Sequence, residues 1–216
     1  AHGGPESHYS NGWLTSYSSP GQVGAAKGYA VFYPNYRGST GRGIEYLKSS
    51  QGDPAGKEFD DIVDGVDYLI EEGIADPDKV GVTGGSYGGY ATGWMATYYS
   101  DHFAAGVMNF GISDNISSWG TGDIHVDKAQ TPLLITHGMA DTRVYPGQSF
   151  ELYRHMKVRK PEVPLRFVQY PGAGHGYRRA AVRYDYSLRM FRWFDSYLKG
   201  NGDFPQMSID KEIEKR

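Results

Sequence analysis

Residues 79–90 read KVGVTGGSYGGY, and this stretch decides the fold. Its apolar start predicts a buried strand, and the glycines that follow predict a sharp turn into a helix. Gly84, Ser86 and Gly88 fit the Gly-x-Ser-x-Gly nucleophile elbow, because a turn this tight leaves room only for glycines two positions before and after the serine. The pattern predicts Ser86 as a nucleophile that projects above a sheet, with the backbone N–H of Tyr87 directed at an oxyanion.

Strand-like and helix-like patterns alternate along the chain. Continuous apolar runs, which are typical of strands buried on both faces, predict strands at 29–33, 79–83, 104–110, 132–136 and 165–170. Helical spacing predicts helices at 59–70, after Gly88 through Met95, at about 146–156 and at about 181–198, the last ended by a left-handed Gly200. The alternation predicts an α/β fold with a mostly parallel sheet and helices on both faces. We expect one domain over residues 1–200 and a polar tail over 201–216.

Two more reactive residues follow predicted strands and so belong to the same rim of the sheet as Ser86. Asp141 comes after the strand at 132–136, and His175 comes after the strand at 165–170, between two glycines. A serine hydroxyl needs a base, and the base needs an orienting acid. Because the chain order Ser86, Asp141, His175 is that of α/β-hydrolases, we expect these residues to form a catalytic triad.

Composition argues against several other functions. The 216 residues include no Cys, which removes disulfides, thiolate catalysis and Cys-based metal sites but leaves the compartment open. The net charge of −3 argues against a nucleic-acid partner, and no apolar run is long enough to span a membrane. The remaining histidines lack metal-ligand spacing, and His137 is more consistent with a structural role, so we expect neither a metal nor another cofactor.

A dinucleotide site is the rival interpretation of the glycine-rich turn. Residues 83–88 resemble the start of a dinucleotide-binding loop, but position 90, where that loop needs another glycine, is Tyr90. Such a loop also normally opens its domain, whereas this one lies in the middle of the chain. The hydrolase interpretation is therefore preferred.

Six motifs spread along the chain point to one family. They are HGGP at 2–5, PNYRGSTG at 34–41, GGSYGGY at 84–90, HGMADTRV at 137–144, YPGAGHG at 170–176 and YSLRMFRWFDSYLKG at 186–200. With these motifs the chain resembles the catalytic domain of the prolyl oligopeptidase (S9) serine peptidases, and it looks most like the acylaminoacyl-peptidase branch. The resemblance extends over nearly the whole chain to about Gly200.

The resemblance implies the same triad and adds an oxyanion hole. Ser86 is the implied nucleophile, Asp141 the orienting acid and His175 the base. An HGG loop after an early strand supplies an oxyanion N–H in many α/β-hydrolases, so Gly4 is expected to join Tyr87 as the second donor.

The resemblance also implies two substrate contacts. Arg143 is expected to bind a substrate carbonyl, which a guanidinium beside the triad can do, and a structural salt bridge is the alternative for this residue. Trp119 is a candidate for the pocket that receives the residue before the scissile bond, with a place in the core as its alternative.

The sequence departs from the family pattern at two places. The β-propeller and the strands that normally precede HGGP are absent, and the stretch from 110 to 131 is short, as if a segment near 123–127 were missing. We therefore expect an N-terminally truncated part of a longer chain with a β-propeller upstream. An uncovered sheet edge would also favour association with a second copy.

The expected function is hydrolysis of short or N-blocked peptides through an acyl-enzyme. A carboxylesterase or another non-peptide hydrolase would use the same triad, so only a comparison of peptide and ester turnover separates the two. A non-catalytic interaction domain with this fold would need a broken triad, and this one is intact in sequence.

Overall fold

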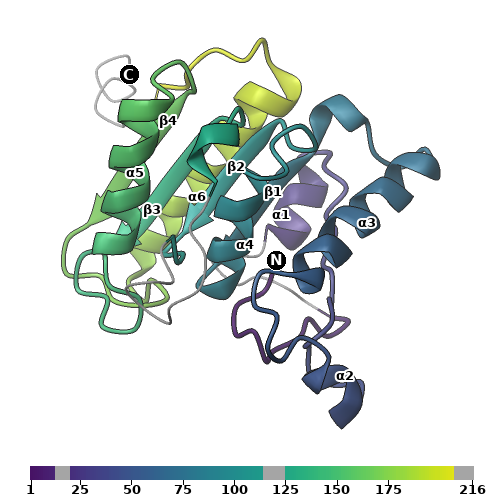
Figure 1. Cartoon of the computed structure of the whole chain (residues 1–216). Helices are drawn as coiled ribbons and strands as arrows, with labels where there is room; N and C mark the ends of the chain where they lie inside the picture. Colours follow the sequence, from purple (N-terminus) through teal and green to yellow (C-terminus); the bar gives the residue numbers. More distant parts are fainter. Residues whose placement is uncertain (13–19, 114–124, 207–216) are drawn as a thin grey trace.

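The computed structural model describes residues 1–12, 20–113 and 125–206 (Figure 1). At its centre lies a parallel sheet in the order β1-β2-β3-β4, with bounds Gly81–Gly85, Ala105–Asn109, Leu133–Gly138 and Leu165–Tyr170. Because the strands are parallel, their carboxyl ends lie at one rim, where the loops after β1, β3 and β4 meet. The predicted α/β class is confirmed.

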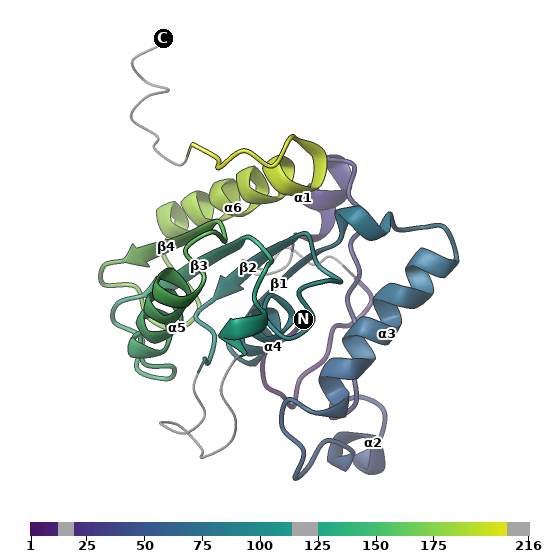
Figure 2. The same cartoon turned by 45° about the horizontal axis from the view of Figure 1, so that its top comes forward.

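Helices cover both faces of the sheet (Figures 1 and 2). The helices α4 (Tyr87–Met95) and α5 (Gly147–Arg159) lie on one face, and α6 (Ala180–Phe194) lies on the other. The helix α3 (Lys57–Glu71) packs beside α4, with the Phe59 ring 5.3 Å from the Tyr90 ring. Two short helices that the sequence pattern does not predict are α1 (Gly21–Ala26) and α2 (Ile44–Lys48).

The end of α6 differs from the prediction. The helix continues into one wider π-helical turn, Asp195–Lys199, and Gly200 follows with φ −93° rather than in the left-handed conformation. A Cβ at Gly200 would lie 2.8 Å from the carbonyl oxygen of Ser196. Glycine is therefore needed here for a close approach of two backbone segments, and not for a positive φ.

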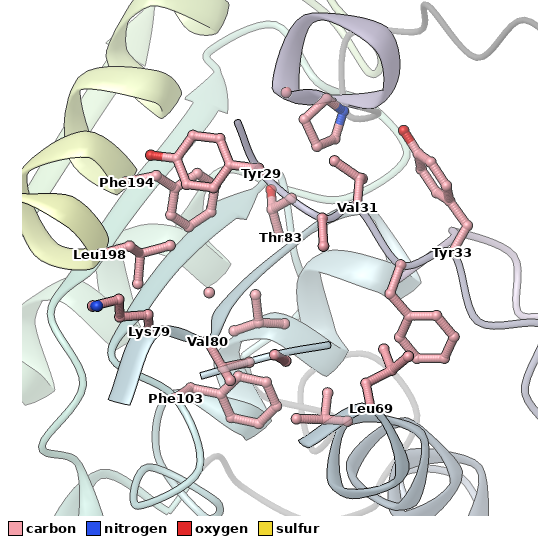
Figure 3. A pocket seen from close by; sticks show the side chains of 18 of the residues that line it. Tyr29, Val31, Tyr33, Leu69, Lys79, Val80, Thr83, Phe103, Phe194 and Leu198 are labelled. Atoms are coloured by element: carbon pink, nitrogen blue, oxygen red, sulfur yellow. The ribbon is translucent and has the colours of Figure 1, made fainter. Parts of the chain in front are cut away.

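The predicted strand at 29–33 is also wrong, since this segment makes no ladder with any described strand. Between it and β1 lies a cavity of about 460 Å³, with Tyr29, Val31 and Tyr33 on one side (Figure 3). Val80 and Thr83 line the opposite side. An apolar run forms a strand only where a neighbour offers backbone partners, and the cavity separates this run from the edge of the sheet.

No helix in the described ranges is long and apolar enough to cross a membrane. Within the same ranges, no group of histidine and acidic side chains is arranged to hold a metal ion.

Candidate active site

Ser86 occupies the turn between β1 and α4. Its backbone has φ 61° and ψ −122°, a conformation that residues with a Cβ rarely adopt. Two hydrogen bonds hold it there: its N–H donates to the Asn109 carbonyl at 3.1 Å, and its carbonyl accepts from the Tyr90 N–H at 3.0 Å. Ser86 is half-buried while the residues on either side of it are buried, so its side chain is the accessible part of the elbow.

The glycines two positions from Ser86 are required by close packing. A Cβ at Gly84 would lie 2.4 Å from the Gly88 carbonyl oxygen, and a Cβ at Gly88 would lie 2.3 Å from the Ala1 carbonyl oxygen. Neither position has room for a larger residue. The physical reason for the Gly-x-Ser-x-Gly spacing is thus confirmed.

Asp141 and His175 are brought together from the loops after β3 and β4. The Nδ1 atom of His175 lies 2.8 Å from Oδ2 of Asp141. The other carboxylate oxygen, Oδ1, accepts the backbone N–H groups of Arg143 at 2.9 Å and Val144 at 3.0 Å. The Asp141 side chain is fully buried, whereas the His175 side chain is 18% exposed and can meet a molecule from solvent.

The pKa of Asp141 results from opposing effects. Burial by itself raises the pKa of a carboxyl group. Contacts with His137 and His175 and the N–H groups of Arg143 and Val144 outweigh burial, so the pKa lies well below its usual range. The carboxylate therefore stays ionised at neutral pH and can orient an imidazole and stabilise its protonated form.

His137 is a second histidine on the same carboxylate. It is fully buried, and its Nδ1 lies 2.7 Å from the hydroxyl of Ser149. Its Nε2 lies 3.0 Å from the Val144 carbonyl oxygen and 3.4 Å from Oδ2 of Asp141. These contacts agree with the structural role predicted for it.

Phe110 connects the base to the elbow. Its ring lies 4.6 Å from the His175 ring, centroid to centroid. A Cβ at Gly85, the residue before Ser86, would lie 2.9 Å from the same ring. In the part of the chain that is described, no hydrogen bond joins Ser86 to His175. Such bonds often form only when substrate is bound, so the expected contact stays a prediction.

The HGGP segment lies against the elbow. A Cβ at Gly3 would lie 3.3 Å from Cβ of Ser86 and 3.9 Å from its Oγ. Gly4, the next residue, has a φ of +133°. His2 anchors the segment: its ring stacks on the Tyr36 ring with 4.2 Å between centroids, and its Nε2 lies 2.8 Å from the Ser39 hydroxyl. The structure thus brings the segment that contains Gly4 to the turn that contains Tyr87.

Of the two residues predicted to contact substrate, Arg143 lies in the part of the chain that the structure describes. Arg143 is exposed and has no ion-pair partner in the described ranges, so the alternative of a structural salt bridge finds no support there. Trp119 lies outside the described residues.

Two residues at this site have no signal in the sequence. In the sequence Phe110 is the last residue of a predicted strand, and its unusual positive φ of 35° is seen only in the structure. Glu58 lies just before the helix predicted at 59–70, and nothing in the sequence marks it for burial, yet it is fully buried and accepts a hydrogen bond from the Tyr87 hydroxyl at 2.6 Å. A pattern of charges along a helix cannot tell a buried carboxylate from a solvated one.

Comparisons with known proteins point to one family. The family model described as the prolyl oligopeptidase family matches residues 15–125 and 123–201, nearly all of the chain. The uncharacterized peptidase YuxL of Bacillus subtilis (strain 168) is 34% identical over 228 residues, which cover 91% of this chain and 34% of that protein.

Two solved structures share the fold. A Mycobacterium tuberculosis puromycin-hydrolyzing peptidase superposes with a TM-score of 0.83 at 26% identity, covering 93% of this chain and 34% of that one. An acylaminoacyl peptidase in complex with Z-Gly-Gly-Phe-chloromethyl ketone gives a TM-score of 0.80 at 28% identity, covering 100% of this chain and 38% of that one. This chain spans about a third of the length of these relatives. It belongs to the prolyl oligopeptidase family.

Proposed function

We propose that this protein is a serine peptidase that hydrolyses short or N-blocked peptides, with Ser86 as nucleophile, His175 as base and Asp141 as orienting acid. The observation that carries the proposal is the 2.8 Å contact between His175 and Asp141 at the rim where Ser86 stands on its elbow. Family membership supports the same chemistry. The likeness to an acylaminoacyl peptidase favours peptides with a blocked amino end.

The first half of the reaction forms the acyl-enzyme. Nε2 of His175 takes the proton from the Ser86 hydroxyl as Oγ bonds to the scissile carbonyl carbon, and the carbonyl oxygen becomes an oxyanion. Asp141 holds Nδ1 of His175 and stabilises the imidazolium that results. The tetrahedral intermediate then expels the amine, which leaves with the proton that Nε2 carried. The acyl group remains on Ser86.

The second half releases the acid product. His175 takes a proton from water, whose oxygen attacks the acyl carbon, and the proton returns to Ser86 as the ester bond breaks. In both halves the oxyanion accepts hydrogen bonds from the backbone N–H groups of Gly4 and Tyr87. One such donor lowers the barrier by about 3 kcal/mol.

Arg143 supports a peptide over a simple ester as substrate. Arg143 is exposed, and its backbone N–H binds Asp141. Because its guanidinium has no ion-pair partner in the described ranges, it is free to bind a second carbonyl of a peptide. A minimal ester has no such carbonyl. We further propose that a β-propeller upstream in the full-length chain restricts access to short peptides, and that the protein forms a homo-oligomer.

The test is a turnover panel combined with trapping of the intermediate. Acylated aminoacyl amides, unblocked aminoacyl amides and short-chain esters are compared, and an activated ester is used to load the enzyme for mass spectrometry. We expect the blocked amides to be preferred and the acyl mass to be found on Ser86. Preference for esters would indicate the esterase alternative, and absence of any acylated serine together with absence of turnover would indicate a non-catalytic domain.

A further inference from the structure

Glu58 is a carboxylate in the first turn of α3 for which the proposed mechanism has no role, and it is fully buried. Its Oε1 atom accepts hydrogen bonds from the backbone N–H of Ala55 and from the Tyr87 hydroxyl, both at 2.6 Å. Its Oε2 atom is buried with no hydrogen-bond partner among the residues that the structure describes. Burial raises the pKa of Glu58. Because a buried carboxylate costs free energy, simple packing does not explain a glutamate at this position.

Tyr87 connects this carboxylate to the nucleophile. It follows Ser86 directly and is the first residue of α4. Its buried ring packs against the rings of Phe59 and Tyr90 at 5.6 and 5.8 Å between centroids. A tyrosine side chain has only about two rotatable bonds, so a fixed hydroxyl restricts where the backbone at its other end can lie.

The backbone that this contact restricts is strained. Ser86 has φ 61° and ψ −122°, and such a conformation persists only where several contacts impose it. Ala55, on the far side of the carboxylate, also has a positive φ of 60°. The Oε1 atom of Glu58 therefore ties together the loop before α3, α3 itself and the first residue of α4.

We propose that the hydrogen bond between Glu58 and the Tyr87 hydroxyl positions the backbone N–H of Tyr87 toward the oxyanion. Both side chains are positioning residues, since neither touches the substrate. The inference rests on the proposed function, because it assigns a task to the same oxyanion hole. An N–H that is misdirected weakens binding of the transition state more than binding of the substrate, so kcat falls while KM changes little.

Three variants separate the hydrogen bond from other effects. Tyr87→Phe keeps the ring and removes the hydroxyl. Glu58→Gln keeps an oxygen that can accept from both donors while it removes the charge, and Glu58→Leu removes the acceptor while it fills a similar volume. Each is assayed for kcat and KM on an acylated aminoacyl amide, and for its melting temperature.

The structure offers a matched control on the same helix. The Tyr99 hydroxyl donates to Oδ1 of Asp60, which is on α3. Tyr99 lies in the segment that follows α4, at the opposite end of that helix from Ser86. Tyr99→Phe therefore removes the same kind of contact without a path to the oxyanion hole. It reports what a merely structural tyrosine–carboxylate bond contributes.

We expect Tyr87→Phe and Glu58→Leu to lower kcat by about tenfold or more with KM within about twofold, since small displacements of catalytic groups have effects of this size or larger. Glu58→Gln is expected to keep most of the rate, and Tyr99→Phe to keep all of it. A kcat for Tyr87→Phe equal to that of Tyr99→Phe would overturn the proposal. If Glu58→Leu does not fold, Tyr87→Phe still decides.

Failure of this inference can be told from failure of the proposed function by labelling with a fluorophosphonate. Wild-type protein that is not labelled at Ser86 contradicts the proposed function itself. Wild-type protein that is labelled and active, together with a Tyr87→Phe variant of unchanged kcat, contradicts only the positioning role.

Discussion

The α-amino nitrogen of Ala1 donates a hydrogen bond of 2.7 Å to the carbonyl oxygen of Thr83, on the open edge of β1. This is the direction in which a neighbouring parallel strand would bond to β1. Beyond it the cavity of about 460 Å³ is lined mainly by apolar side chains from β1, the 29–34 segment, α3 and α6 (Figure 3). An open strand edge beside apolar surface is a site at which chains associate.

We therefore predict that residues 1–216 associate with themselves as concentration rises, as measured by sedimentation velocity. Val31→Lys places a charge on the wall of the cavity and should shift the population toward monomer, because a buried charge opposes docking of an apolar partner. Val158→Lys, at an exposed position on α5, serves as the control and should change nothing. A wild-type chain that stays monomeric over the whole range contradicts the prediction.

Replacement of the triad residues should abolish turnover without unfolding the protein. Ser86→Ala should reduce kcat to near background, and Asp141→Asn should reduce it on the order of 10⁴-fold, because an amide no longer fixes the tautomer of His175. Asp127→Asn is the matched control, since Asp127 is an exposed carboxylate paired with Arg159 far from this rim. Substantial activity in Ser86→Ala would rule out its role as nucleophile.

Arg143→Ala should affect peptides and esters differently. Loss of a contact to a second carbonyl lowers kcat/KM for a peptide substrate by about tenfold or more, because a hydrogen bond to a charged group contributes about 1.5–3 kcal/mol, while a minimal ester is spared. Arg159→Ala, which removes an exposed arginine elsewhere, should leave both substrates unaffected. Equal losses on peptide and ester would mean that Arg143 supports the Asp141 loop instead.

The sequence predicts well those elements that are marked by glycine-rich turns or by clear apolar runs. The strand at 165–170 has the predicted bounds, and the turn at Ser86 lies where the glycines place it, because steric demands at Gly84 and Gly88 are local. The sequence also predicts that Asp141 and His175 lie close together, because parallel strands bring the loops that follow them to one rim of the sheet.

The features that the sequence does not predict depend on residues that are distant in sequence but adjacent in the fold. The apolar run at 29–33 has the composition of a strand, but pairing requires a neighbour, and a cavity lies between this run and β1. The burial of Glu58 follows from the way α3 packs beside α4, which no charge pattern along α3 records.

The buried His2 makes the stability of the protein depend on pH. Burial lowers the pKa of His2 from its ordinary 6.5 to about 4, an effect that the hydrogen bond to the Gly3 carbonyl only partly offsets. Between these two pH values the unfolded chain binds a proton that the folded chain does not. Folding is therefore most favoured by this group above pH 6.5, and the contribution is lost as pH falls toward 4.

The free energy of unfolding, measured with urea at several pH values, should decrease between pH 6.5 and 4 by up to about 1.4 kcal/mol per pH unit from His2 alone. His2→Gln keeps polar atoms near Ser39 and Tyr36 but does not titrate, so its slope should be flatter in this window. His8→Gln is the control, because His8 bonds to Thr40 at an exposed position. Identical unfolding profiles for wild type and His2→Gln would show that His2 is not a neutral buried histidine.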